Sequence, residues 1–285
     1  MKMNILVTLD SNYLYPLKVM LKSMFFHHPN DTFNIYVMHS RIKPEEIEDL
    51  KQFAAREGSE IIEVKIGEEH FADAPLLMHY TKEMYYRLLA FKFLPKELDR
   101  ILYLDPDILV INSVKPLYTL DITGYLYAAA YRNQLGTAEV NKIRLKPYDI
   151  DAYYNSGVLL MNLALQRQYI DEEKIFEFVK KYHWKLILPD QDVMNALFAR
   201  LIYPLDEKIY NYDVRKFRSY RTSSKGKFDM DYVIKNTVFL HFCGKKKPWH
   251  PDYRGRFHAL YKHYEKLAFP KEEVVEEEAL VVASV

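Results

Sequence analysis

Short apolar runs typical of buried strands alternate with helical patterns through the first two-thirds of the chain, and this alternation limits the fold most. Residues 5–9, 33–38 and 61–66 have the length and composition of strands. Pro44, followed by two acids, marks the start of a helix between the second and third runs. Between the first two runs lies a helical stripe: Leu17, Met20, Leu21 and Met24. The pattern predicts an α/β fold in which one mostly parallel sheet has helices on both faces.

The rest of the chain continues the same alternation with closer spacing. Further strands are predicted at residues 101–104, 125–130, 157–161 and 237–242. Further helices are predicted at residues 85–94, after Asp190-Gln191-Asp192, and at a stripe capped by Asp171: Ile175, Phe178, Val179 and Tyr182. The polar, basic segment 216–227 is predicted to be a loop. No linker divides the chain, so we expect a main domain at residues 1–250, a helical extension at 251–270 and a poorly ordered acidic tail at 271–285.

Composition places the chain among soluble globular proteins. Of its 285 residues, 49% are hydrophobic and 28% are charged, and the net charge of +1 gives no general case for nucleic-acid binding. Cys243 is the single cysteine, which excludes an intrachain disulfide and a cysteine metal cluster. No stretch approaches the roughly 18 apolar residues of a membrane span, and the first apolar run is too short for a signal peptide. We therefore expect a cytoplasmic protein.

Two carboxylates, Asp105 and Asp107, follow the apolar run at residues 101–104. Side chains two residues apart on a strand face the same way, so this pair would point together where the strand leaves the sheet. Such carboxylates repel each other and raise one pKa, and a divalent cation removes that repulsion. Ligands of open α/β sheets bind beyond the carboxyl ends of strands, so the pair indicates a hard metal ion that carries a phosphate. Ordinary turn chemistry explains Asp-Pro-Asp equally well.

A second polar motif occupies residues 241–249, where the last predicted strand ends. Gly244 would let a phosphate approach the backbone closely, and Lys247 would offer a positive charge to a diphosphate. Taken alone, a basic loop after a strand is usually a solvated turn, and a single histidine such as His241 is usually structural. The motif by itself leaves both interpretations open.

Six motifs occur together and in order: Asp10-Ser11-Asn12-Tyr13, Tyr86-Arg87-Leu88, Leu104-Asp105-Pro106-Asp107, Asn155-Ser156-Gly157-Val158-Leu159-Leu160, Asp190-Gln191-Asp192 and His241-x-x-Gly244-x-x-Lys247-Pro248-Trp249. This ordered set resembles glycosyltransferase family 8, the retaining GT-A enzymes that include bacterial lipooligosaccharide galactosyltransferases and glycogenin. The resemblance spans roughly residues 4 to 250. It implies a GT-A fold with a Rossmann-like sheet, and a catalytic domain at residues 1–250.

The resemblance assigns the nucleotide and the metal to particular residues. Asp10 and Asn12, with the backbone near Thr8, would hold the uridine, and Gly244 and Lys247 would bind the diphosphate. The metal ligands would be three further residues: Asp105, Asp107 and His241. Oxygen and imidazole ligands suit Mn²⁺, with Mg²⁺ as the alternative.

Four residues match those that line the donor sugar in this family: Arg87, Asn155, Asp190 and Gln191. Each has a structural alternative, since Asp190 could cap its helix, Asn155 could be a turn residue and Arg87 could pair with a surface acid. Gln191 matches the residue on the face of the sugar where a nucleophile would stand, and an amide is a poor nucleophile. A transient covalent intermediate and same-face attack both stay open.

The implied reaction moves a hexose from a UDP-sugar to a hydroxyl of a glycan or glycolipid acceptor, of the cell envelope or elsewhere, and keeps the anomeric configuration. The metal and Lys247 would stabilise charge on the departing UDP. One departure concerns the sugar: where galactosyltransferase relatives have an acid after the strand that follows Asp-x-Asp, this chain has Ala128-Ala129-Ala130-Tyr131. That difference puts galactose and lactose-like acceptors in doubt.

Two other functions are compatible with parts of this sequence. A sugar-nucleotide pyrophosphorylase needs a glycine-rich loop near its start, and residues 4–12 contain no glycine. A non-catalytic nucleotide-sugar binding protein is disfavoured because all three metal-ligand positions are present. The basic and aromatic helix pattern within residues 254–266 fits either peripheral contact with the inner face of the membrane or packing on the protein body: Arg254, Arg256, Phe257, Leu260, Tyr261, Lys262 and Lys266.

Overall fold

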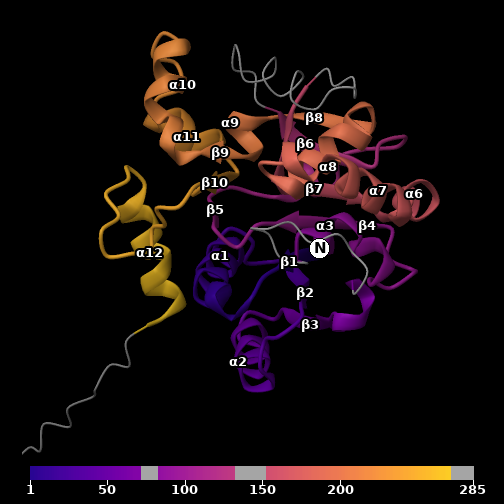
Figure 1. The fold of residues 1–285 in the computed structure, drawn as a ribbon. Helices are drawn as coiled ribbons and strands as arrows, with labels where there is room; N and C mark the ends of the chain where they lie inside the picture. Colours follow the sequence, from indigo (N-terminus) through magenta and orange to yellow (C-terminus); the bar gives the residue numbers. More distant parts are fainter. Residues whose placement is uncertain (72–82, 132–151, 271–285) are drawn as a thin grey trace, which may run out of the picture.

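The computed structural model describes residues 1–71, 83–131 and 152–270, and its centre is a twisted sheet (Figure 1). Within this part of the chain, seven strands form the sheet in the spatial order β3 (Glu60–Lys65), β2 (Thr32–His39), β1 (Lys2–Thr8), β4 (Arg100–Leu104), β7 (Tyr154–Asn162), β6 (Tyr127–Tyr131) and β8 (Ile202–Asp206). All pairs are parallel except the two that β7 makes with β4 and β6. The predicted mostly parallel sheet is therefore confirmed.

A smaller sheet, which the sequence did not indicate, continues from the edge where β4 ends. It has the order β5 (Ile108–Val110), β10 (Phe239–His241) and β9 (Tyr212–Asp213). β10 runs antiparallel to β5, and this register places His241 opposite Ile108. The pairing brings the end of the last strand beside the turn that follows β4.

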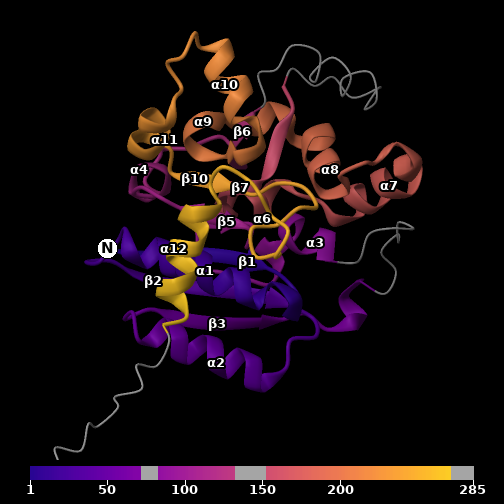
Figure 2. The same cartoon turned by 90° about the vertical axis from the view of Figure 1, so that its left-hand side faces the viewer.

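Helices cover both faces of the large sheet (Figures 1 and 2). One face is covered by α1 (Leu14–Phe26), α2 (Pro44–Ala55) and α12 (His258–Ala268), and the other by α3 (Glu83–Leu88), α6 (Leu163–Tyr169), α7 (Glu172–Tyr182) and α8 (Pro189–Phe198). Four further short helices are α4 (Lys115–Tyr118), α9 (Glu207–Tyr210), α10 (Phe217–Ser223) and α11 (Met230–Asn236).

Strand alternation divides the core into two apolar clusters, one on each face of the sheet. On β1, Ile5 belongs to the cluster under α1 and Leu6 to the cluster under α3 and α8. On β4, Leu102 and Tyr103 divide in the same way. Because both faces are apolar, the central strands are hydrophobic at nearly every position.

The prediction of a loop at residues 216–227 was wrong in its first half, where α10 forms. Phe217 and Tyr220 are buried, although the segment is polar and basic overall. Tyr220 packs edge-on against Tyr212 with ring centroids 4.9 Å apart, and Phe217 packs against Phe257 at 6.1 Å. Two aromatic side chains thus anchor a helix that has too few apolar residues to be recognised from its periodicity.

The C-terminal segment packs on the protein body. α12 lies along α1, where Tyr15 stacks on Phe269 with centroids 4.4 Å apart and Tyr264 hydrogen-bonds His27 (Figure 2). Phe257 and Tyr261 are buried, so these aromatic residues are not presented to a membrane surface. No described helix combines the length and the apolar composition that crossing a membrane requires. The predicted tail at residues 271–285 lies outside the described residues, and the boundary at residue 250 stays a prediction.

Candidate functional site

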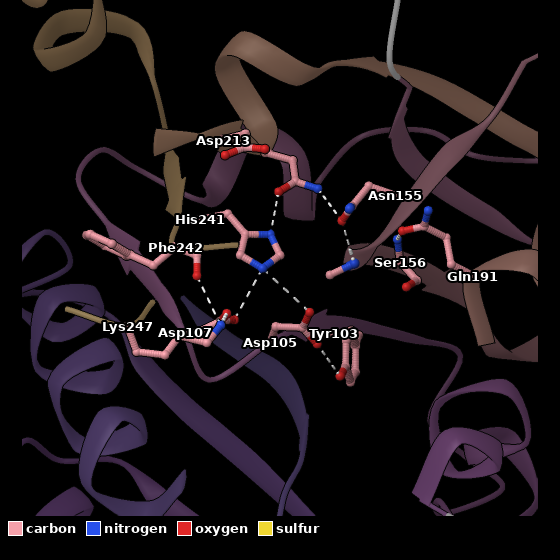
Figure 3. Close-up of polar contacts among 12 residues, drawn as sticks. Tyr103, Asp105, Asp107, Asn155, Ser156, Gln191, Asp213, His241, Phe242 and Lys247 are labelled. Carbon is pink, nitrogen blue, oxygen red and sulfur yellow. Dashed lines mark hydrogen bonds and ion pairs between the residues drawn. The ribbon is translucent and has the colours of Figure 1, made fainter. Parts of the chain in front are cut away.

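The ends of β4 and β10 bring two carboxylates and an imidazole together (Figure 3). His241 Nε2 lies 3.7 Å from Asp105 Oδ2 and 3.2 Å from Asp107 Oδ1. One potential ligand atom from each of the three residues lies within 4.8 Å of the other two. Asp107 and His241 are buried and Asp105 is half-buried. This set, named here the Asp–Asp–His cluster, has the spacing that a shared cation requires, with ligand types that suit Mn²⁺ or Mg²⁺.

Opposite charges hold the cluster in its ionised form. Burial tends to raise the pKa of Asp107, but His241 and Lys247 outweigh burial and hold that pKa well below its usual range. Burial likewise tends to lower the pKa of His241, but Cys243 and Asp107 raise it well above its ordinary value. Asp107 is therefore a carboxylate at neutral pH, as a metal ligand must be.

Two asparagines, Asn155 and Asn211, fix the orientation of His241. Asn211 Nδ2 donates to Asn155 Oδ1 (2.5 Å), which leaves Asn211 Oδ1 to accept a hydrogen bond from His241 Nδ1 (2.7 Å). The proton on Nδ1 directs the other ring nitrogen, Nε2, toward the two carboxylates. Asn155 Oδ1 also accepts from the backbone N–H of Gly157 (2.8 Å). Asn155, predicted beside the donor sugar, thus lies next to the cluster, and sequence reasoning missed Asn211.

Gly157, on β7, allows the strand to pass against the cluster. A Cβ at this position would lie 2.4 Å from His241 Cε1 and 2.7 Å from Asp105 Oδ2. Its carbonyl accepts a hydrogen bond from the backbone N–H of Asp105 (2.8 Å). Glycine is therefore required here by space rather than by its backbone angles.

Arg87, near the end of α3, connects the cluster to the start of α8. Its guanidinium lies 2.8 Å from Asp105 Oδ1 and 2.7 Å from Asp190 Oδ2, and it donates to Ser156 Oγ at 3.0 Å. It also lies over the ring of Tyr103, whose hydroxyl donates to Asp105 (2.6 Å). Burial tends to lower the pKa of Arg87, but Asp105 and its other neighbours raise it above its usual value. Arg87 is therefore paired with site carboxylates and not with a surface acid.

Asp190 and Gln191 lie in the first turn of α8, and Asp190 does not cap that helix. Asp192 accepts hydrogen bonds from the backbone N–H groups of Ile187 (2.7 Å) and Leu188 (3.0 Å) just ahead of the helix. Asp190 instead accepts from Ser156 Oγ (2.9 Å) in addition to Arg87. Gln191 Oε1 accepts from the backbone N–H of Ser156 (3.2 Å). Its buried Nε2 has no hydrogen-bond partner within the part of the chain that the structure describes. This amide therefore offers a spare donor.

A cavity of about 340 Å³ lies on one side of the cluster. Its wall includes the backbone and side chains of Thr8, Asp10, Tyr13, Arg87, Asp105 and Asp107. Asp10 accepts a hydrogen bond from the backbone N–H of Asn12 (2.9 Å), which starts a short 3₁₀ turn, but Asn12 is not part of the wall. Tyr13, quoted in the first motif but given no role from the sequence, offers an aromatic ring to this cavity.

The two residues predicted to bind the diphosphate have different surroundings. Lys247 forms an ion pair with Asp107 and donates to the carbonyl of Phe242 (3.0 Å). Burial tends to lower the pKa of Lys247, but Asp107 raises it, so the ammonium stays charged beside the cluster. Gly244, with φ of +91°, borders a different cavity and approaches Arg215 so closely that a Cβ would lie 2.6 Å from Nη1. The three consecutive alanines of β6 are buried: Ala128, Ala129 and Ala130.

Comparisons with known proteins agree with this geometry. The family model "Glycosyl transferase family 8" matches residues 4–252. General stress protein A of Bacillus subtilis is 27% identical over 268 residues, which cover 92% of each chain. A lipopolysaccharide 1,2-glucosyltransferase of Escherichia coli is 28% identical over 245 residues, or 85% of this chain and 71% of the relative. The crystal structure of the galactosyltransferase LgtC, solved with donor and acceptor sugar analogs, superimposes with a TM-score of 0.76 at 24% identity, covering 93% of this chain and 96% of that one. The predicted GT-A fold is thereby confirmed.

Proposed function

Since the chain belongs to glycosyltransferase family 8 and is a glycosyltransferase, we propose a specific reaction for it. The protein moves a hexose from a UDP-sugar to an acceptor hydroxyl of a cell-envelope glycan or glycolipid. The retaining stereochemistry of the family fits this reaction. The observation that carries the proposal is the Asp–Asp–His cluster, where Asp105, Asp107 and His241 converge from two distant segments. A bound Mn²⁺, or Mg²⁺, would supply Lewis-acid stabilisation for the departing diphosphate.

Residues on two sides of the Asp–Asp–His cluster would bind different parts of the donor. The cavity beside Thr8, Asp10 and Tyr13 has room for a nucleoside, and the Tyr13 ring can stack on a base. Lys247 already pairs with Asp107, so it is close enough to neutralise charge on a diphosphate bound beside the Asp–Asp–His cluster. Asn12 and Gly244 would contact the nucleotide through the backbone of their loops.

The donor sugar would lie toward β7 and α8. Arg87 and Ser156 hold Asp190 in place, and the spare Nε2 donor of Gln191 is available to a sugar oxygen. An amide next to the anomeric carbon favours attack on the same face over a covalent intermediate, because it is a weak nucleophile. The alanines of β6 stand where the galactosyltransferase relatives are expected to have an acid, which supports a donor other than galactose.

The relatives support an acceptor in the cell envelope, since one of them is a lipopolysaccharide glucosyltransferase. The cytoplasmic location expected from the sequence stays a prediction, and the contact of residues 254–266 with a membrane is unsupported because their aromatic side chains are packed inward. Turnover of the UDP-sugar distinguishes the proposed enzyme from a non-catalytic nucleotide-sugar binding protein.

The test is turnover of a panel of UDP-sugars, measured as release of UDP with and without Mn²⁺. We expect loss of activity with a chelator, recovery with Mn²⁺, and a loss that Mn²⁺ cannot restore in Asp107→Asn. Asp231→Asn, an exposed carboxylate on α11, is the matched control and should retain full activity. Binding of UDP-sugar without any turnover would favour the binding protein, and full activity of Asp107→Asn in chelator would overturn the metal site.

A further inference from the structure

A second cavity, of about 830 Å³, opens beside the loop that follows β10, and basic side chains dominate its wall. Among the described residues that line it, Asp252 is the one carboxylate, against six cationic residues: Arg215, Arg218, Lys245, Lys246, Arg254 and Arg256. The whole chain has a net charge of only +1. Positive charge is therefore concentrated at this cavity, which we call the basic cavity.

Most of this charge is not neutralised by neighbouring acids. Arg215 is paired with Asp213 through two contacts, of 2.9 and 2.7 Å. The other five cations make no ion pair with a carboxylate of residues 1–71, 83–131 or 152–270. The side chain of Arg254 donates to the carbonyls of Pro251 and Tyr253 at 2.9 and 3.0 Å. Neutral contacts of this kind position a guanidinium and leave its charge available to an anion.

Aromatic packing holds the wall of the basic cavity in shape. The guanidinium of Arg256 lies 4.4 Å from the centre of the Phe217 ring, and Phe217 in turn packs against Phe257. Phe217 is buried in α10, the helix that the sequence did not predict. The cations therefore stand on a packed support, in a concave surface rather than on a flat one.

The basic cavity lies next to the reaction site. Its wall includes Cys243 and Gly244, which follow His241 directly in the chain, and Cys243 also borders a small space shared with Asn155 and Asn211. The nucleoside cavity, by contrast, is lined from Thr8, Asp10 and Tyr13 and shares no residue with the basic cavity. An anion in the basic cavity would thus stand near the cluster without occupying the nucleoside position.

We propose that the basic cavity binds a phosphate group of the acceptor, so that the preferred acceptor is a phosphorylated saccharide. Arginine forks and lysine ammonium groups are the protein groups that recognise phosphate best. The concave wall favours a phosphate on a sugar over the plane of a membrane surface. That the bound phosphate belongs to an acceptor rests on the proposed function, whereas the binding of a phosphate in the basic cavity does not.

The test uses glucose 6-phosphate as the probe, with glucose as the uncharged comparison. Calorimetric titration is done with protein that is already saturated with UDP and Mn²⁺. We expect glucose 6-phosphate to bind, glucose to bind far more weakly, and binding to weaken as salt is raised. The triple variant Arg218→Gln, Lys245→Gln, Lys246→Gln should weaken binding about tenfold or more, because it removes three charge-assisted contacts.

The control variant removes the same charge elsewhere: Lys51→Gln, Arg56→Gln, Lys180→Gln, all exposed and distant in sequence from the basic cavity. It should leave binding of glucose 6-phosphate unchanged. Equal weakening in both variants, or equal affinity for glucose and its phosphate, would overturn the proposal. Binding of glucose 6-phosphate to the protein without UDP that is lost once UDP and Mn²⁺ saturate the protein would assign the cavity to the donor instead. Binding of phosphatidylglycerol vesicles without binding of the sugar phosphate would assign it to a membrane and also overturn the proposal.

UDP-sugar hydrolysis without acceptor separates this inference from the proposed function. Both triple variants should hydrolyse UDP-sugar as the unchanged protein does, and melting curves should show that both are folded. A protein that hydrolyses UDP-sugar but ignores glucose 6-phosphate contradicts the acceptor inference alone. A protein that binds glucose 6-phosphate but never turns over UDP-sugar contradicts the proposed function alone.

Discussion

At the scale of single residues, the Asp–Asp–His cluster depends on supporting side chains as well as on its own three members. Among the described residues Asn211 has no hydrogen bond to Asp105 or Asp107, yet its hydrogen bond fixes which nitrogen of His241 faces these carboxylates. Such supporting residues typically change metal affinity 10- to 100-fold when they are removed. A motif search finds ligands by spacing and misses these supports.

We expect Asn211→Ala to weaken Mn²⁺ binding by about 10- to 100-fold, because His241 loses the acceptor that orients its ring. Activity should recover at high Mn²⁺, which distinguishes a positioning role from a catalytic one. The measurement is activity against Mn²⁺ concentration, together with the melting temperature. Asn236→Ala, an exposed residue at the end of α11, is the control. An unchanged Mn²⁺ dependence in Asn211→Ala would remove Asn211 from the site.

Asp190→Asn and Gln191→Ala should lower the single-turnover rate strongly and leave the affinity for UDP nearly unchanged, because both residues lie toward β7 and not in the nucleoside cavity. Asp192→Ala is the contrast, since Asp192 accepts hydrogen bonds from two backbone N–H groups just ahead of α8, and leaving them unpaired should cost about 1–3 kcal/mol of stability. Rapid-quench rates, UDP titrations and melting curves measure these effects. A stable Asp190→Asn enzyme with a normal rate would exclude Asp190 from the chemistry.

At the scale of elements, β7 and β10 decide whether the cluster can form. β7 passes so close to His241 and Asp105 that only glycine fits at position 157. β10 delivers His241 through its pairing with β5. Neither relation is visible in local sequence, because each depends on strands that are far apart in the chain.

Gly157→Ala should abolish Mn²⁺-dependent activity, since its Cβ would stand 2.4 Å from His241 Cε1 and displace the ring. The matched control is Gly124→Ala, at φ +82° with no atom within 4 Å of the added carbon. That change should cost about 1–2 kcal/mol of stability through backbone strain and leave activity intact. Wild-type Mn²⁺ affinity in Gly157→Ala would show that the close approach is unimportant.

Local patterns predicted the elements well where burial follows a regular period. The α1 stripe of Leu17, Met20, Leu21 and Met24 is fully buried, and Asp171 caps α7 as expected. α10 was missed because its helix depends on Tyr212 and Phe257, which lie outside the segment. The direction of β7 was also beyond the sequence, since an apolar run reads the same for parallel and antiparallel pairing.

At the scale of the whole molecule, the site joins the N-terminal and C-terminal halves of the chain. The nucleoside cavity comes from the loop after β1, while His241 and Lys247 come from the end of β10. Motif order predicted the three residues of the Asp–Asp–His cluster, and the structure brings them together. The basic cavity could not be predicted from the sequence, because its residues are scattered over three segments.

UDP with Mn²⁺ should therefore raise the melting temperature more than GDP or ADP does under the same conditions. A ligand that binds only the folded protein adds about 2.7 kcal/mol of stability at a hundredfold excess over its Kd. The shift should be much smaller without Mn²⁺, and it should fall in His241→Ala. Equal thermal shifts for the three nucleotides would contradict the assignment of Asp10 and its loop to uridine.

The late position of β10 has a consequence for biosynthesis. A chain emerging from the ribosome exposes Asp105 and Asp107 long before the segment that carries His241 has been translated, and folding proceeds from the N-terminal side. The pairing of β10 with β5 thus waits until the chain has been translated past residue 241. Nascent and prematurely terminated chains that lack this strand also lack His241, so they cannot complete the Asp–Asp–His cluster.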